Sequence, residues 1–471
     1  MDPLDRKIEE EIFQINQAVT NPISYLYECV IHTPNMDIPA FSVSQTELVR
    51  DYMKNFSDEY SINVTVVLDQ AVFDILPFKS QLYITIKKTP LLKNQVVTKD
   101  TRLASEGTRY RCQLWDNTSI ILEQQSLAIK NRAVARSVGM VSLKFQMITE
   151  VVEKLRVKTV GSSYRNIKPG DLIRYILGKY SRNEGDDASI QVKGVDIVPG
   201  INETVYEHIA LGHNKALINA PRLIERYVGG LYPTGMGYYL QNGMWYVFSP
   251  YDIERFKKAP RTLTIINLTK DRYPNPEKTY RNTPSQLTFI STGGVKHVDM
   301  SDEQQLNQGN AVRFIDAASV MNGFVKTGGN KAVIDRTKNT RQYMVNPREE
   351  GENVVGNASS VVTSNYLLEM GKLARRSGSI AQFSWENSND ALVFPGMPVR
   401  VIYSTGETTR EIYGIVISME TLTMNVSNNP VERQLRANSA VTVFLSNHIL
   451  PSEYREPTAG DNNEQTPTTG G

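Results

Sequence analysis

Histidines and carboxylates at short spacing are the side chains that most often bind metal ions, and two such groups stand out in this sequence. His208 and His213 lie five residues apart with no carboxylate between them, so they lack the pattern of a zinc-protease helix. Asp299, Asp302 and Glu303 form an acidic cluster whose spacing does not match an EF-hand calcium loop. We therefore predict no metal site and no cofactor.

Glycine-rich segments and nucleophiles give no stronger signal. The segment Gly328-Gly329-Asn330-Lys331 lacks the spacing of a phosphate-binding loop, and no strong strand pattern precedes it. The segment Gly235-Met236-Gly237 lacks the third glycine and the helix of a dinucleotide-binding motif. His32, His297 and His448 stand alone, and no serine or cysteine has the context of a nucleophile elbow. A long chain without a plausible catalytic set favours a structural or binding role, so we predict that the protein is not an enzyme.

A hydrolase with paired carboxylates is the alternative from the enzyme class. Asp299 with Asp302, or Glu349 with Glu350, would then have to converge in a cleft. Finding catalysis that depends on such a carboxylate would contradict the structural interpretation.

Aromatic residues are concentrated on both sides of Asn242-Gly243, which is the strongest short hairpin signal in the sequence. Tyrosine and tryptophan combine an apolar ring with one polar group, a combination that suits protein interfaces. We therefore predict a hairpin whose rings contact a partner, through Tyr238, Tyr239, Trp245 and Tyr246. A deep pocket lined by these rings would instead indicate a carbohydrate- or peptide-binding module.

The basic run from 326 to 341 is the second candidate contact surface. In a protein of nearly neutral charge, we interpret it as a charged loop at a subunit contact or facing a lumen, with Lys331 and Arg336 as its interface residues.

Composition excludes several classes of function. The 471 residues are 40% hydrophobic and 22% charged, which is ordinary for a globular protein with two to four domains. The formal net charge is +2, so bulk charge implies neither specific nucleic-acid binding nor an anionic membrane. Cys29 and Cys112 are too few for a disulfide framework, and the N-terminus lacks the apolar core of a signal peptide. We therefore expect a reducing cytoplasmic environment during assembly.

Alternating apolar residues predict a β-rich fold with some helices. Strands are expected at Tyr25–Ile31, from Ser61 onward, and at Gln81–Lys87. We also predict helices at 4–18, Glu47–Phe56, Leu172–Tyr180 (capped by Asp171), most of Thr204–Tyr227, and Ser364–Arg376. The segment Phe145–Val157 fits either strand or helix.

Two segments have a similar sequence pattern. Leu76–Ile84 and Phe394–Ile402 each place an apolar residue before proline, then a short turning step, then an alternating strand. This similarity reflects either an internal duplication of one barrel or two independent strands that begin after proline.

The aromatic segment Tyr232–Phe248 and the late strand that begins Pro395-Gly396-Met397-Pro398-Val399 resemble the baseplate hub proteins of contractile-tailed bacteriophages. The resemblance covers about Tyr25 to Ile449 and carries over no catalytic residues. It implies an α+β, β-rich fold with two tail-tube-like antiparallel β-barrel domains and inserted α/β segments. It also implies a homotrimeric ring in the virion that contacts the tail tube protein, the central spike protein and baseplate wedge proteins, without a membrane. The alternative within this class is another tail ring protein, such as a distal tail or tube-initiator protein.

The domains expected on this basis divide the whole chain. They are an N-terminal helix or arm at 1–20, a first barrel at 21–123, an inserted α/β domain with the aromatic hairpin at 124–260, connecting β segments with a long polar loop at 261–360, a second barrel at 361–450 and a disordered tail at 451–471.

Overall fold

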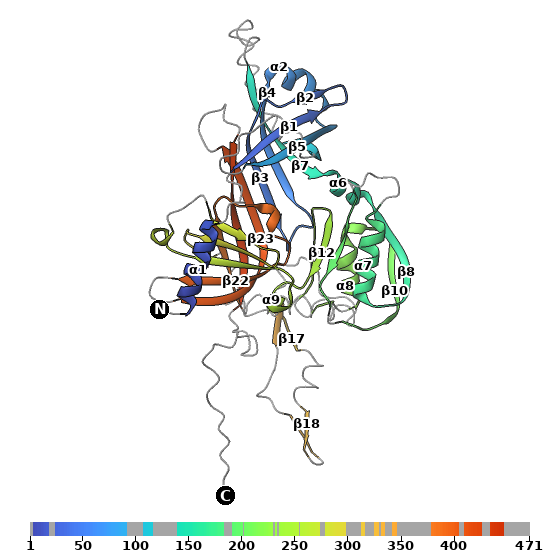
Figure 1. Ribbon diagram of the computed structural model, residues 1–471. Helices are drawn as coiled ribbons and strands as arrows, with labels where there is room; N and C mark the ends of the chain where they lie inside the picture. Colours follow the sequence, from blue (N-terminus) through green and yellow to red (C-terminus); the bar gives the residue numbers. More distant parts are fainter. Residues whose placement is uncertain are drawn as a thin grey trace.

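The computed structural model (Figure 1) consists of a large β-sheet structure with a smaller α/β part beside it. The structure describes residues 3–17, 24–91, 107–115, 139–182, 191–200, 202–228, 231–232, 235–253, 255–273, 278–297, 312–315, 325–328, 331–334, 342–345, 378–404, 409–425 and 434–446. The predicted β-rich α+β fold is confirmed.

Strands from both ends of the chain pair edge to edge in a closed circuit, which we call the closed barrel. Its order is β1, β5, β6, β7, β4, β3, β23 and β24, and β24 returns to β1 where Leu435 lies opposite Tyr25. The bounds are β1 Ser24–His32, β3 Ser42–Asp51, β4 Glu59–Val67, β5 Leu82–Leu91, β6 Thr108–Leu114, β7 Met140–Thr149, β23 Thr409–Asn425 and β24 Gln434–Ser446. Every pairing in this circuit is antiparallel, and alternate residues of β1, β4, β5 and β7 form most of the hydrophobic interior.

The remaining large strands form a second unit, which we call the open barrel. Its strands are β14 Tyr280–Asn282, β15 Gln286–Ser291, β13 Thr262–Asn267, β22 Pro398–Ser404 and β21 Gly378–Trp385, together with β23 and β24. Strand β13 pairs in parallel with both β15 and β22, a departure from the antiparallel pairing expected. The rings of Phe289 on β15 and Trp385 on β21 stack with centroids 4.8 Å apart, so aromatic packing links two strands that share no backbone pairing among the described residues.

Two long strands run through both barrels. The first half of β23 pairs with β22 of the open barrel, and its second half pairs with β3 of the closed barrel. Likewise, β24 pairs with β1 near its start and with β21 further along. A register shift between Val416 and Ser418 marks the point where β23 passes from one barrel to the other. Because the same backbone belongs to both barrels, the two form one continuous body (Figure 1).

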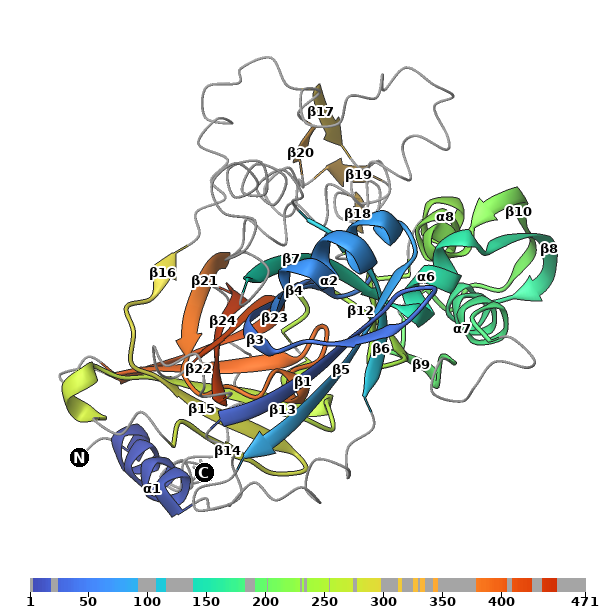
Figure 2. The ribbon, with the colours of Figure 1, turned by 90° about the horizontal axis from the view of Figure 1, so that it is seen from above.

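Helix α1, Pro3–Gln17, lies against the outer face of the open barrel (Figure 2). Ile8 and Ile15 are fully buried on one side of this helix, against apolar residues of β13, β15 and β22. Burying such side chains contributes about 1.5–3 kcal/mol each. The guanidinium of Arg281 donates to both carboxylate oxygens of Glu11 at 2.7–3.2 Å, which fixes the helix in place. The N-terminal helix is therefore docked on its own chain.

The inserted α/β part lies to one side of the barrels in both views. Its elements are α6 Glu150–Val157, β8 Thr159–Ile167, α7 Pro169–Tyr180, β9 Gly194–Ile197, β10 Tyr206–Ala216, α8 Ala220–Val228, β11 Gly237–Gln241 and β12 Met244–Phe248. Helices α7 and α8 pack with the hairpin around Trp245 in a core of their own.

Short elements complete the described chain. They are β2 Asp37–Pro39, α2 Leu68–Gln70, a π-helix Ala71–Ile75, 3-10 turns at Leu76–Phe78, Leu217–Asn219, Lys270–Arg272 and Asp390–Leu392, α9 Arg255–Lys258, β16 Lys296–His297, β17 Val312–Ile315, β18 Val325–Gly328, β19 Lys331–Ile334 and β20 Gln342–Val345. No helix in the described residues is long and apolar enough to cross a membrane.

Three expectations about local structure are wrong. The predicted helix Glu47–Phe56 is largely strand β3, because pairing with β4 and β23 on both edges overrides the helical preference of its residues. The predicted helix at Thr204–Tyr227 begins with strand β10, and only α8 is helical. Asp171 does not cap α7, because Lys168 occupies the N-cap position and Pro169 starts the helix.

Other expectations are confirmed or lie outside the described residues. Strands β1 and β5 and helix α7 are confirmed, and Phe145–Val157 is strand followed by helix. The predicted helix Ser364–Arg376 lies outside the described residues. The two similar segments lead into β5 of the closed barrel and β22 of the open barrel, while duplication stays a prediction. The connecting β segments expected after residue 260 include β13 to β15, and the domain boundaries stay predictions.

Candidate functional site

Among the described residues, the structure does not assemble the predicted metal-binding or catalytic candidates into a site. His208 and His213 both lie on β10 and are exposed. Within the described residues, no three histidine, cysteine or acidic side chains are grouped so as to hold a metal ion. The carboxylates considered for a hydrolase, at 299, 302, 349 and 350, lie outside the described residues, as do Glu303 and Arg336. Lys331 lies opposite Gly328 where β18 pairs with β19.

The predicted hairpin at Asn242-Gly243 is confirmed. Strands β11 and β12 pair in antiparallel register, and the two turn residues have φ angles of 53° and 76°. A two-residue turn of this type needs positive φ at both positions, which asparagine and glycine tolerate best. Strand β9 then pairs in parallel with the other edge of β12, so both edges of β12 are covered.

The aromatic residues of this hairpin divide between two hydrophobic cores. Tyr239 is fully buried in the core of the open barrel, and Tyr246 packs against the same core. Tyr238 and Trp245 belong to the core of the α/β part, where the Trp245 indole donates to the hydroxyl of Ser181 at 3.0 Å. Because side chains alternate across a strand, one hairpin forms a wall between two cores. The rings predicted to contact a partner therefore pack inside the chain.

A buried group of charged residues lies where the closed barrel, the open barrel and the hairpin meet, and we call it the ionic joint. Arg50 on β3 donates to the carboxylate of Asp58 at 3.1 Å and to the backbone carbonyl of Asp390 at 2.6 Å. Lys88 on β5 donates to the carboxylate of Asp390 at 2.5 Å. The hydroxyl of Tyr239 on β11 donates to Asp58 at 3.0 Å. Only 4% of the Arg50 side chain and 12% of the Asp390 side chain is exposed.

The pKa of Asp390 reflects this environment. Burial disfavours the charged form, but Lys88 and Arg50 together more than offset that effect and lower the pKa of Asp390 to about 2. Burial also opposes protonation of Lys88, yet the nearby carboxylate of Asp390 raises its pKa above the ordinary value. Both groups are therefore charged near neutral pH. Removing one member of such a buried pair leaves the other uncompensated, which is far more costly than losing a surface ion pair.

The sequence contains one local signal for this joint. Leu82, Ile84 and Ile86 point into the closed barrel, and the same alternation places Lys88 on the inner side. A lysine that continues an inward apolar series requires a buried carboxylate partner. No comparable local pattern indicates Asp390, which lies in a polar turn about 300 residues away.

A second group of side chains is connected in the order carboxylate, histidine and hydroxyl, as in a hydrolytic triad. Asp37 lies 2.7 Å from one ring nitrogen of His32, and the hydroxyl of Thr85 lies 2.7 Å from the other. The Asp37 side chain is 71% exposed, so water competes for its carboxylate. We interpret these bonds as a link that fastens β2 to the outer face of β5.

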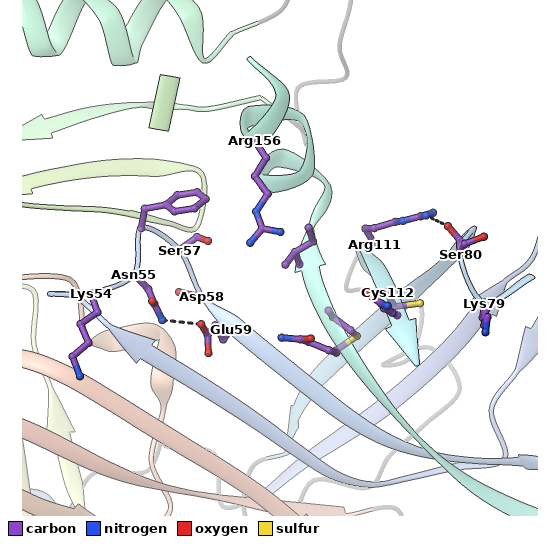
Figure 3. A pocket seen from close by; sticks show the side chains of 15 residues that line it. Lys54, Asn55, Ser57, Asp58, Glu59, Lys79, Ser80, Arg111, Cys112 and Arg156 are labelled. Atoms are coloured by element: carbon purple, nitrogen blue, oxygen red, sulfur yellow. Dashed lines mark hydrogen bonds between the residues drawn. The ribbon is translucent and has the colours of Figure 1, made fainter. Parts of the chain in front are cut away.

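A cleft opens beside the ionic joint, between the closed barrel and helix α6 (Figure 3). Its volume is about 420 Å³. Residues 54–59, the ends of β6 and β7, and Arg156 of α6 contribute to its walls. None of His32, Asp37 and Thr85 lines this cleft.

No family model matches the sequence, and no curated protein matches it. Several solved structures do. The 43 kDa tail protein of prophage MuSo2 from Shewanella oneidensis is 8% identical with a TM-score of 0.43, and the match covers 88% of this chain and 98% of that one. The tail protein from Neisseria meningitidis is 8% identical with a TM-score of 0.40, covering 89% and 96%. The prophage tail protein gp18 from Listeria monocytogenes is 12% identical with a TM-score of 0.33, covering 89% and 94%. All three are described as tail proteins.

Proposed function

We propose that this chain is a structural virion protein of a bacteriophage tail, forming the baseplate hub ring that joins the tail tube to the central spike. The observation that carries the proposal is the sharing of β23 and β24 between the closed and open barrels. A connector between two assemblies must transmit force without bending at a linker. Two barrels built on the same two strands have no such linker between them.

The ionic joint supports the same role. It ties β3, β5, the segment before β22 and the aromatic hairpin to one another through buried, charge-assisted hydrogen bonds. Tyr239 holds the hairpin against the barrels, and Trp245 on the other face of the hairpin packs in the core of the inserted α/β part. The chain is thus suited to act as one rigid subunit with several outward surfaces.

The assembly follows from the family that the sequence resembles. Three chains with two barrels each would place six barrels around one axis and match a six-fold tail tube. The barrels would stack on the tube protein, and the inserted α/β part would contact the spike or neighbouring wedge proteins. Assembly would take place in the host cytoplasm, and DNA would pass through the lumen without specific contacts.

The nearest alternative is a different ring protein of the tail, such as a distal tail or tube-initiator protein. Both roles need a rigid ring, so the barrels alone do not distinguish them. Binding to the central spike does, because it is expected of a hub and not of a ring elsewhere on the tube.

Native mass spectrometry of the purified chain, alone and with the tail tube and central spike proteins of the same phage, tests the proposal. We expect a trimer, or a monomer that becomes a trimer when the spike is added. A trimer that binds the tube but ignores the spike would favour the alternative ring role. A monomer indifferent to every tail component would overturn both.

A further inference from the structure

The cleft between the closed barrel and α6 has a mixed but cationic lining (Figure 3). Its charged residues are the cations Lys54, Lys79, Arg111 and Arg156 and the carboxylates Asp58 and Glu59. The other polar residues that line it are Asn55, Ser57, Ser80, Gln113 and Gln146. Amide and hydroxyl side chains both donate and accept hydrogen bonds, so they match the backbone groups of a peptide.

Two cations of the cleft, Arg156 and Lys79, have no side-chain partner among the residues that the structure describes. The side chains of Arg156 and Lys79 make no hydrogen bond or ion pair within the described residues, and both residues are exposed. Figure 3 shows Arg156 reaching from α6 into the cleft. Arg111 is already engaged, because its guanidinium lies 3.6 Å from Glu153 and also donates to the carbonyl of Ser80.

The carboxylates of the cleft are, by contrast, occupied. Asp58 accepts hydrogen bonds from Arg50 and Tyr239 in the ionic joint. Glu59 accepts one from the side-chain amide of Asn55 at 2.9 Å. Arg50 neutralises Asp58, whereas Glu59 keeps its charge because its hydrogen-bond partner is a neutral amide. Arg156 and Lys79 together outweigh that one carboxylate, so the net charge offered to an incoming ligand is positive.

We propose that this cleft binds an acidic peptide segment of a neighbouring protein in the assembly, with Arg156 and Lys79 pairing with its carboxylates. A guanidinium presents two parallel donors that match a carboxylate, and the volume of about 420 Å³ suits a few side chains. The negative charge of Glu59 on the wall disfavours a polyanion such as nucleic acid, whose charges are closely spaced. A peptide can place its carboxylates opposite the cations and its neutral groups elsewhere.

The source of the segment rests on the proposed function, but binding at the cleft does not. A synthetic peptide therefore tests the cleft on the isolated full chain. If native mass spectrometry shows the ring and the peptide does not bind, only this inference fails. If the peptide binds and no ring forms, only the proposed function fails.

The probe is a fluorescein-labelled pentapeptide, Gly-Asp-Glu-Asp-Gly, followed by fluorescence anisotropy at about 50 mM salt. The matched peptide Gly-Asn-Gln-Asn-Gly has the same size and the same label without the three side-chain charges. A single-stranded DNA oligonucleotide serves as the polyanion competitor. We expect saturable binding of the acidic peptide with a Kd below about 1 mM, weakened severalfold at about 500 mM salt.

Charge-removing variants locate the binding. We expect Arg156→Gln and Lys79→Gln each to raise the Kd about three- to tenfold, and the double variant to raise it further. Arg174→Gln removes an arginine from the same α/β part whose side chain is 57% exposed and pairs with Asp171, so it is the matched control and should leave binding unchanged. Because the three substituted side chains are exposed, all variants should melt at the temperature of the parent chain.

Three results would overturn the inference. They are the absence of saturable binding, equal binding of the neutral peptide, and an unchanged Kd for the acidic peptide in the double variant. Tighter binding of the oligonucleotide at the same residues would replace the peptide with a nucleic acid and also overturn it.

Discussion

Asp390 and Lys88 are 302 positions apart in the sequence, yet the carboxylate of one lies 2.5 Å from the ammonium of the other. Lys88 lies on β5 of the closed barrel, and Asp390 lies in the turn between β21 and β22 of the open barrel. The two residues therefore connect the barrels inside the molecule, at a place already joined by β23 and β24. The arrangement makes the relative position of the barrels a property of the fold, and it can be tested by substitution.

The first prediction concerns Asp390→Asn. This change leaves Arg50 and Lys88 without their shared counter-charge, so the free energy of unfolding should fall by about 3–5 kcal/mol. Asp171→Asn also removes an ion-paired carboxylate, but that pair is 57–61% exposed and should change stability by less than about 1 kcal/mol. Urea denaturation followed by tryptophan fluorescence measures both. Equal effects from the two variants would contradict the role of the joint.

The second prediction concerns acid stability. The pKa of Asp390 is lowered from 3.8 to about 2, so the folded state resists protonation more than the unfolded state does. Its contribution to stability is present above about pH 4 and is lost as the pH falls toward 2, amounting to about 2 kcal/mol. Urea denaturation at pH 5, 4 and 3 (chosen test values) should show a steeper loss in the parent chain than in Asp390→Asn. Parallel slopes would mean that this carboxylate does not titrate abnormally.

The third prediction concerns the aromatic hairpin. Tyr239→Ala removes a ring that is fully buried between the barrels and the α/β part, together with the hydrogen bond to Asp58. By analogy with other buried aromatic residues, the free energy of unfolding should fall by about 3–5 kcal/mol. Phe73→Ala is the control, because 70% of Phe73 is exposed. If Tyr239→Ala is as mild as the control, the hairpin does not stabilise the body of the molecule.

The fourth prediction concerns close backbone approach at the shared strands. A Cβ atom on Gly414 of β23 would lie 1.9 Å from the carbonyl oxygen of Phe444 on β24, and neither backbone can move without breaking the pairing. Gly414→Ala should therefore lower the melting temperature by more than about 8 °C or prevent folding. Gly294→Ala has open space around it and should be nearly neutral. Thermal denaturation of both compares them, and a tolerated Gly414→Ala would contradict the described pairing.

Structural features that depend on neighbouring residues were predictable from the sequence, whereas features that depend on distant strands were not. The turn at Asn242-Gly243 was predictable because positive φ angles are a property of those two residues. Helix α7 was predictable from its apolar spacing, although Pro169 rather than Asp171 defines its start. Strand β3 was not, because its residues favour a helix and only its two neighbouring strands, β4 and β23, make it extended.

The candidate site was also predictable only in part. The sequence indicated the aromatic residues of the hairpin, but whether Tyr239 and Trp245 face a partner or the interior depends on what packs on each side of the sheet. In the structure, both faces are covered by cores of the same chain. The cleft beside α6 had no local signal, because its lining comes from residues 54–59, 79–80, 111–113, 146–148 and 156, which only the fold brings together.

The sequence by itself determined the alternation of β1, β4 and β5, the hairpin turn and helices α1 and α7, because each depends on residues a few positions apart. Only the tertiary structure decided that β1 pairs with β24, that β23 and β24 serve two barrels, and that Lys88 meets Asp390. Pairing between distant strands is selected by the apolar surface and the charges that the whole chain must bury at once. No short segment of sequence contains that information.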